Sequence, residues 1–299
     1  MNQKELKNRQ PLNSSIDDLL LSWEASPYPS LKVSSYFPVY AELFGHLRNT
    51  DCTFIEVGVL DGGSLFMWRK WLGDKARIIG IDLNPEATRW REHGFEIYIG
   101  DQGDPSFWDT TFSEIGQFDA LLDDGGHQSF QQIVTLIEAI RFAHNQCVIA
   151  IEDTATSLMK DFSRHGANSF LEFSKDATDV LIGRSFEMYK GRLPSHLNKK
   201  IIDQFKLVYS IQFFNGIVAF KIDPSFSFIP ENVRNRPSNS ATDFRYEGLD
   251  SAYIDWPHPF KQRTVKVRGG VDFKYYCLTV LKSFVPDNLK AFLVKFLGK

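Results

Sequence analysis

The chain has 299 residues, which is enough for one main α/β domain with extensions at both ends. Its formal net charge of -3 gives no overall attraction to polyanions, so we expect no nucleic-acid partner. The N-terminus has no apolar core of signal-peptide length, and no apolar run reaches the roughly eighteen residues that a membrane span needs.

The sequence pattern changes near residue 51. Residues 1–50 form a mainly polar lead-in, with short helices predicted near Ile16–Trp23 and over Phe37–Arg48. From Cys52 onward, strands alternate with helices, which predicts crossover connections and a parallel sheet covered on both faces. The predicted strands are Cys52–Val57, Arg77–Ile81, Phe95–Ile99, Phe118–Leu122 and Cys147–Ile151. The predicted helices are Gly62–Leu72, one beginning at Pro85, Gln128–Phe142 and Asn168–Leu181.

An antiparallel hairpin is predicted to close the sheet. Strands over Leu207–Phe214 and Ile217–Ile222 flank Asn215-Gly216, a pair typical of a tight hairpin turn. Dinucleotide-binding domains usually finish with parallel strands, so this ending disfavours them. We expect a Rossmann-like, doubly wound α/β sheet, mostly parallel with a C-terminal antiparallel hairpin, over residues 51–222. The lead-in at 1–50 and an extension at 223–299 flank this domain.

Glycines and acids follow the first three predicted strands, at the edge where an open parallel sheet binds ligands. The first strand leads into EVGVLDGGS, which lacks the G-x-G-x-x-G phosphate pattern, so a dinucleotide is disfavoured. Asp82 is placed to take both hydroxyls of a ribose, and Asp101-Gln102 suits the edge of an adenine. Each acid alone could be a helix cap, but together they favour a nucleoside ligand. The residues assigned to cofactor binding are Glu56, Gly58, Asp61, Gly62, Ser64, Asp82, Asp101, Gln102 and Asp123.

A second polar cluster follows the fourth and fifth strands. Because these strands are expected to be neighbours, Asp124, Glu152 and Asp153 should converge, with His127 beside them. Clustered carboxylates repel one another unless a cation is shared, and oxygen ligands favour Mg²⁺ or a similar divalent ion. Such an ion can chelate two adjacent hydroxyls and lower the pKa of one, while His127 takes the proton as general base. The alternative is that DDGG is a simple turn and Glu152-Asp153 caps the next helix.

Five segments carry a family resemblance: FIEVGVLDGGS, GIDLNP, GDQGD, LLDDGGH and IEDTATS. Together they resemble class I S-adenosylmethionine-dependent methyltransferases of the macrolide-sugar O-methyltransferase group, related to cephalosporin hydroxylase-like and rhamnosyl O-methyltransferase proteins. The resemblance covers about Pro29–Ile222. It implies S-adenosylmethionine as methyl donor and Mg²⁺ bound by Asp124, Glu152 and Asp153, with His127 as base. It also implies Glu56, Gly58, Asp82 and Asp101 in the cofactor site, and a lid formed by Lys32, Ser35, Tyr36 and Tyr40.

The expected function is O-methylation of a sugar hydroxyl on a glycan, glycolipid or glycosylated metabolite, as in polysaccharide biosynthesis. The spacing of ligands and base is also similar to that of catechol O-methyltransferases, where the base is a lysine and the last two ligands are Asp-Asn. A catechol or phenolic acceptor therefore stays open. A nicotinamide-dependent oxidoreductase and a non-catalytic binding protein are further alternatives. The missing phosphate pattern argues against the first, and the intact set of acids and His127 argues against the second.

The C-terminal stretch is basic and amphipathic. From Pro259 to Lys299, nine Lys and Arg residues outnumber two acids, and Phe292, Leu293, Phe296 and Leu297 share one face of a predicted helix. Such a face suits peripheral contact with the inner face of an anionic membrane, the protein's own core, or a second subunit of a homo-oligomer. Cys52 and Cys147 lie in apolar predicted strands, as expected for free thiols in a reducing, cytoplasmic compartment.

Overall fold

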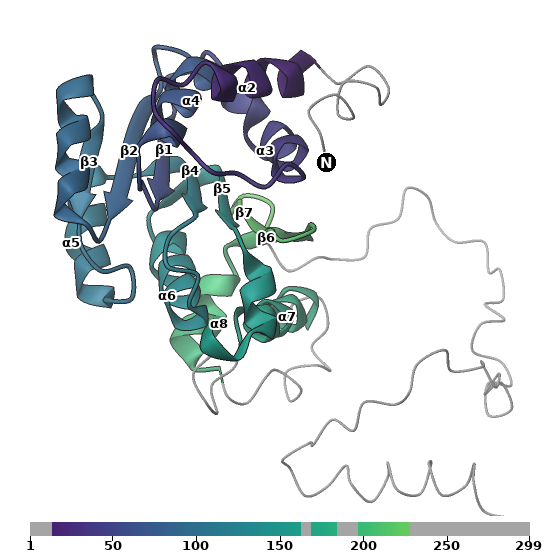
Figure 1. The fold of residues 1–299 in the computed structure, drawn as a ribbon. Coiled ribbons are helices and arrows are strands. Elements are labelled where there is room, and N and C mark those ends of the chain that lie inside the picture. Colours follow the sequence, from purple (N-terminus) through teal and green to yellow (C-terminus); the bar gives the residue numbers. More distant parts are fainter. Residues whose placement is uncertain (1–13, 163–168, 184–196, 228–299) are drawn as a thin grey trace, which may run out of the picture. The chain divides into compact units, whose positions relative to one another are not determined.

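A seven-stranded sheet organises residues 14–162, 169–183 and 197–227, the part of the chain that the computed structural model describes (Figure 1). The strand order is β3-β2-β1-β4-β5-β7-β6, with β7 antiparallel to both of its neighbours and the pairs from β3 to β5 parallel. The strands are β1 (Thr53–Val57), β2 (Arg77–Asp82), β3 (Glu96–Ile99), β4 (Phe118–Asp123), β5 (Ala143–Ile151), β6 (Val208–Phe213) and β7 (Val218–Ile222). The expected mostly parallel, doubly wound sheet is confirmed.

Helices cover both faces of this sheet (Figure 1). One face packs around Phe54 and Trp68 against α2 (Ser14–Glu24), α3 (Tyr36–Phe44) and α4 (Gly63–Leu72). The other packs around Trp108 and Phe220 against α5 (Pro105–Ile115), α6 (Ser129–Ile140), α7 (Phe170–Gly183) and α8 (Lys199–Phe205). Short 3₁₀ segments are η1 (Gly45–Leu47), η2 (Pro85–His93), η3 (Thr154–Leu158) and η4 (Lys160–Phe162). Because both faces are covered, β1 and β4 are buried along nearly their whole length rather than at alternate residues.

The predicted hairpin is confirmed. β6 and β7 pair antiparallel up to Phe213 and Val218, and the Phe214 N–H donates to the Ile217 carbonyl at 2.8 Å. Gly216 has φ +85°, a conformation that L side chains rarely adopt, which explains the need for glycine in this turn.

Two helices and part of a strand differ from the prediction. The prediction did not include α5, although Asp104 caps it by accepting from the Ser106 N–H at 2.9 Å and Pro105 begins it. It also missed α8, which has only seven residues. β5 begins at Ala143 rather than Cys147, because an exposed polar stretch with positive φ at Gln146 still pairs with β4 through a register shift.

The strand order reverses between β1 and β4. The C-terminal ends of β1, β4 and β5 lie side by side at one edge of the sheet. The Asp124 N–H donates to the Val57 carbonyl at 2.9 Å, and the Glu152 N–H donates to the Asp123 carbonyl at 2.9 Å. The residues that follow β1, β4 and β5 are therefore held side by side at the edge where ligands bind in such sheets.

Three other sequence-based expectations concern the C-terminal extension, the cysteines and membrane-spanning helices. Residues 228–299, which are most of the extension predicted over 223–299 and include its basic tail, lie outside the described residues. Cys52 and Cys147 are buried free thiols. Among the helices that the structure describes, none combines the length and apolar character needed to cross a bilayer.

Candidate active site

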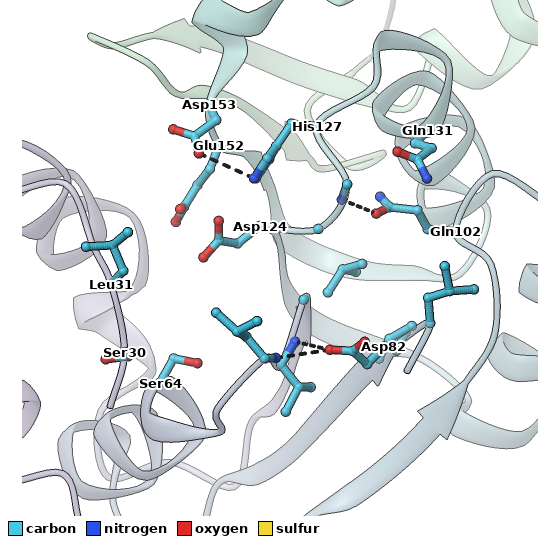
Figure 2. Close-up of a pocket in the computed structure, with 18 of the residues that line it drawn as sticks. Ser30, Leu31, Ser64, Asp82, Gln102, Asp124, His127, Gln131, Glu152 and Asp153 are labelled. Atoms are coloured by element: carbon cyan, nitrogen blue, oxygen red, sulfur yellow. Dashed lines mark hydrogen bonds and ion pairs between the residues drawn. The ribbon is translucent and has the colours of Figure 1, made fainter. Parts of the chain in front are cut away.

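A pocket of about 500 Å³ opens at the carboxyl ends of the parallel strands (Figure 2). Its wall includes residues that follow each of the strands β1 to β5, together with Pro29–Val33 and Tyr36 from the lead-in. Ten of the thirteen residues assigned from the sequence line it; Glu56, Gly62 and Asp123 lie behind the wall. The lining residues from the prediction are Gly58, Asp61, Ser64, Asp82, Asp101, Gln102, Asp124, His127, Glu152 and Asp153.

The turn after β1 depends on two glycines with positive φ. Gly58 has φ +90°, and a Cβ there would lie 2.0 Å from the carbonyl oxygen of Asp124. Gly62 has φ +79°, and a Cβ there would lie 2.3 Å from the Trp90 ring. The absence of a side chain at Gly58 lets the β1 turn pass directly against the loop after β4, and its absence at Gly62 makes room for the Trp90 ring of η2.

The acids after β2 and β3 shape the backbone of the pocket. Asp82 accepts from the Val59 and Leu60 N–H groups at 2.8 and 3.0 Å, and from the Asn84 N–H at 2.8 Å. Asp101 accepts from the Gly103 N–H at 2.7 Å. Both carboxylates also line the pocket, so they remain available to a ligand placed there.

Glu56 is buried beneath the β1 turn. Its carboxylate accepts from Ser64 Oγ at 2.7 Å and Trp68 Nε1 at 3.1 Å, and pairs with Lys32 Nζ at 3.2 Å. Burial raises the pKa of Glu56, and the Lys32 ammonium opposes that rise. Glu56 therefore supports the wall of the pocket from behind. Its buried carboxylate needs a nearby positive charge to remain ionised.

Gln102 fastens the loop after β4. Its Nε2 donates to both oxygens of Asp123 at 3.0 Å and to Thr135 Oγ1 at 3.2 Å, while its Oε1 accepts from the Gly126 N–H at 2.7 Å. Burial raises the pKa of Asp123, and the hydrogen bond from Gln102 lowers it. The side-chain amide that the sequence analysis assigned to the cofactor is thus engaged with the protein, and sequence alone gave no sign of these partners.

Asp124, His127 and Asp153 form the group that could share a metal ion. One potential ligand atom from each lies within 4.8 Å of the others, and Figure 2 shows the three side chains turned toward one another. His127 Nε2 lies 3.5 Å from Asp153 Oδ2, while His127 Nδ1 is buried without a hydrogen-bond partner. His127 and Asp153 both have positive φ, at 55° and 51°, which is uncommon for residues with side chains and typical of functional sites.

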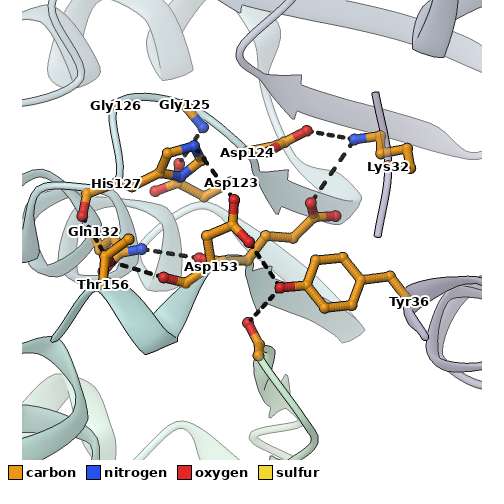
Figure 3. A network of polar contacts seen from close by, with 12 residues as sticks. Lys32, Tyr36, Asp123, Asp124, Gly125, Gly126, His127, Gln132, Asp153 and Thr156 are labelled. Atoms are coloured by element: carbon orange, nitrogen blue, oxygen red, sulfur yellow. Dashed lines mark hydrogen bonds and ion pairs between the residues drawn. The ribbon is translucent and has the colours of Figure 1, made fainter. Parts of the chain in front are cut away.

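Thr156 holds these two strained residues together (Figure 3). Its Oγ1 lies 3.0 Å from the His127 carbonyl oxygen and 2.8 Å from the Asp153 carbonyl oxygen. The backbone after β4 is therefore tied to the backbone after β5 at the site itself.

Glu152 also lines the pocket, but it is not a member of this group of three. Its buried carboxylate accepts a hydrogen bond from Tyr40 and lies 3.8 Å from Lys32 Nζ. The same ammonium lies 2.5 Å from Asp124 Oδ2, so Asp124 and Glu152 converge on a cation, which here is the lysine. Burial raises the pKa of Glu152 well above its ordinary value, and Lys32 opposes that shift.

The lead-in residues predicted to form a lid mostly contact these acids. Tyr36 Oη donates to Asp153 Oδ1 at 2.7 Å and contacts the Gly216 carbonyl oxygen at 3.4 Å (Figure 3). Tyr40, one helical turn further along α3, donates to Glu152. Ser35 is exposed and lies outside the pocket lining. Three of the four predicted lid residues are thus part of the site.

Comparison with solved structures defines the class of fold. The MycE methyltransferase from the mycinamycin biosynthetic pathway, in complex with Mg and SAH, aligns with a TM-score of 0.58 and 21% identity over 72% of this chain and 55% of that chain. The same methyltransferase with Mg, SAH and mycinamycin VI aligns with a TM-score of 0.58 over 76% of this chain. The chain therefore has the class I methyltransferase fold.

Curated relatives narrow the resemblance to sugar O-methyltransferases. The chain is 26% identical over 137 residues to 8-demethyl-8-alpha-L-rhamnosyl tetracenomycin-C 2'-O-methyltransferase of Streptomyces olivaceus, covering 44% of this chain and 36% of the relative. It is 32% identical over 132 residues to the 3'-O-methyltransferase of 8-demethyl-8-(2-methoxy-alpha-L-rhamnosyl)-tetracenomycin-C from the same organism, covering 41% and 33%. It is 24% identical over 183 residues to mycinamicin VI 2''-O-methyltransferase of Micromonospora griseorubida, covering 56% and 44%.

These matches span between a third and a half of the length of the curated relatives. No family model matches the chain. The expected similarity to sugar O-methyltransferases is confirmed over that shared region.

Proposed function

We propose that the protein is an S-adenosylmethionine-dependent O-methyltransferase that uses Mg²⁺ or a similar divalent cation and acts on a sugar hydroxyl. The observation that carries this proposal is the convergence of Asp124, His127 and Asp153 within 4.8 Å, in a pocket also lined by Asp82 and Asp101. The names of the curated relatives support a sugar acceptor, since each of the three methylates a glycosylated natural product.

The cofactor would occupy the part of the pocket nearest β1, β2 and β3. Asp82 would bind the ribose hydroxyls and Asp101 the adenosine, because each lines the pocket at the end of its strand. Gly58, Asp61 and Ser64 would contact the rest of the cofactor along the β1 turn, and Gly62, behind the wall, would let that turn pack against Trp90. Glu56 and Asp123 would act from behind these residues, and Gln102 from the wall itself, through the hydrogen bonds that hold the wall.

The acids at the strand ends suit a divalent cation. Among the described residues, the carboxyl groups of Glu56, Asp124, Glu152 and Asp153 lie close together and share one lysine, so added positive charge would stabilise them when ionised. Asp124 and Asp153 would contact the ion, with Glu152 as the third predicted ligand. Bound there, the ion would make an acceptor hydroxyl more acidic.

His127 would act as the general base. Its imidazole lines the pocket beside Asp124, and the Asp153 carboxylate 3.5 Å from Nε2 would stabilise the imidazolium formed when His127 takes the acceptor proton. The acceptor oxygen then forms a bond to the methyl carbon as the bond from that carbon to sulfur breaks. The products are the methyl ether and neutral S-adenosylhomocysteine.

Two variants test this function. Transfer of a labelled methyl group from S-adenosylmethionine to a panel of nucleotide sugars, glycolipids and phenols should require divalent metal. His127→Ala should lower the rate by about 10² to 10⁴-fold while leaving S-adenosylhomocysteine affinity nearly unchanged. Asp124→Asn should weaken the response to magnesium.

The outcomes separate the alternatives. Normal turnover by the His127→Ala protein would reject its role as base. Transfer to phenols alone would indicate the catechol-type acceptor. Calorimetry that detects NAD binding and no S-adenosylhomocysteine binding would indicate an oxidoreductase instead.

From the sequence alone, we also propose that the protein works in the cytoplasm and that the basic segment from Pro259 onward contacts anionic membranes. Sedimentation with phosphatidylglycerol vesicles should recover the full chain and should fail for a variant that lacks residues 259–299. Equal recovery of both proteins would contradict this role. Loss of self-association in the shortened variant would instead support a homo-oligomer contact.

A further inference from the structure

Lys32 is a buried charge in a loop. It lies between α2 and α3, and its side chain is 2% exposed, although its neighbours Leu31 and Val33 are 87% and 48% exposed. Burial of an ammonium is costly unless charged partners compensate. The direction of Lys32, opposite to both neighbours, therefore requires a specific cause.

Three carboxylates supply that cause. Lys32 Nζ lies 2.5 Å from Asp124 (Figure 3), 3.2 Å from Glu56 and 3.8 Å from Glu152. Asp124 and Glu152 directly follow β4 and β5, and Glu56 is the last residue but one of β1. They raise the pKa of Lys32 above its ordinary value against the effect of burial, so the side chain remains an ammonium.

The backbone on the N-terminal side of Lys32 is fixed against the start of α4. Ser26 Oγ donates to the Gly63 carbonyl oxygen at 2.8 Å. A Cβ on Gly63 would lie 2.3 Å from the carbonyl oxygens of both Tyr28 and Pro29, so the two backbones are in close contact. The backbone just before Lys32 is thus held in place, and the Lys32 side chain reaches the three carboxylates from it.

We propose that Lys32 is a positioning residue that acts as the resident counter-cation of Glu56, Asp124 and Glu152 in the metal-free protein and limits the affinity of the neighbouring metal position. Asp124 is common to both cation positions: it contacts Lys32, and it belongs to the group that could share a metal with His127 and Asp153. The part of this inference that concerns metal affinity rests on the proposed function.

Two consequences follow from charge. Without the ammonium, three acids at the strand ends lose their common partner, so the metal-free protein becomes less stable. The metal position also gains net negative charge, so it binds a divalent cation more tightly. A lysine that served only for packing would produce the first effect without the second.

Lys32→Met tests both consequences, with Lys75→Met at an exposed site as the matched control. In EDTA at pH 8, the Lys32 variant should melt about 10 °C below the wild type, and the control within about 2 °C of it. Titration with Mn²⁺ should give a dissociation constant at least tenfold lower for Lys32→Met than for the wild type. Saturating Mn²⁺ should therefore restore much of the lost melting temperature.

Several results would overturn the inference. These are a melting temperature in EDTA within about 2 °C of the wild type, or unchanged or weaker Mn²⁺ binding by the Lys32 variant. If the wild type bound no Mn²⁺, the metal proposal would fail, while the comparison in EDTA would still decide whether Lys32 is the counter-cation.

A double variant covers the case in which Lys32→Met does not fold. Lys32→Met/Glu56→Gln removes one acid together with the lysine, so it should be more soluble and more stable than Lys32→Met alone. A double variant that is no better than the single one would also overturn the inference.

Discussion

Replacement of Gln102 by leucine should destabilise the protein by about 3 kcal/mol. The variant removes the Nε2 donor that lies 3.0 Å from both oxygens of Asp123, and the Oε1 acceptor of the Gly126 N–H at 2.7 Å. Asp123 is 1% exposed, so water does not readily replace the lost donor. A hydrogen bond to a charged group contributes about 1.5–3 kcal/mol, and the unsatisfied Gly126 N–H adds about 1 kcal/mol or more. The Gly125 N–H, 3.1 Å from Asp123 Oδ1, still donates to this carboxylate in the variant. The expected total is therefore about 3 kcal/mol, near the lower end of the sum of the two contributions.

Urea denaturation measures this loss as a shift of the midpoint without a change in slope. Gln212→Leu, at an exposed position on the edge strand β6, is the matched control and should change the free energy of unfolding by less than about 0.5 kcal/mol. The Gln102 variant should also bind S-adenosylhomocysteine more weakly, because Gly125 and Gly126 line the pocket. A loss below about 1 kcal/mol, or equal losses in the two variants, would refute the role given to Gln102.

Two further predictions concern the β1 turn and the sheet edge. Gly58→Ala should abolish soluble expression or S-adenosylhomocysteine binding, because its Cβ would lie 2.0 Å from the Asp124 carbonyl oxygen; Gly94→Ala, with φ +79° and open space, should cost only about 1–2 kcal/mol. Similar melting temperatures for the two glycine variants would contradict this reading. The Arg77 guanidinium holds the pKa of Glu96 below its ordinary value of 4.5, so the pair stabilises the fold above that value and less as the pH falls through and below it. Glu96→Gln should remove that part of the acid sensitivity, and denaturation curves of equal pH dependence in both proteins would contradict it.

The fold was predictable because local signals and global topology agree. The strand and helix alternation predicted the parallel sheet, and Asn215-Gly216 predicted the antiparallel end that the structure has. α5 was missed even though Asp104 and Pro105 form a helix start, because its polar residues obscure the apolar spacing. α8 was too short for a periodic pattern to emerge.

The site was predictable as a set of strand ends, and its internal pairings were not. Reading the residues after each strand gives the pocket lining, because parallel strands bring their carboxyl ends to one edge. The contacts of Gln102 with Asp123, and of Lys32 with Glu56, depend on distances between elements far apart in the chain. The direction of Glu152, toward Tyr40 and Lys32, depends on the position of α3 over the sheet, which sequence spacing does not encode.

Binding of Mn²⁺, followed by electron paramagnetic resonance, tests most directly whether these acids hold a divalent cation. The wild type should bind one ion, Asp124→Asn should weaken that binding at least about tenfold, and Asp74→Asn, at an exposed position outside the pocket lining, should leave it unchanged. Absence of a bound ion, or equal affinity in the wild type and the Asp124 variant, would contradict a metal-dependent methyl transfer at this site.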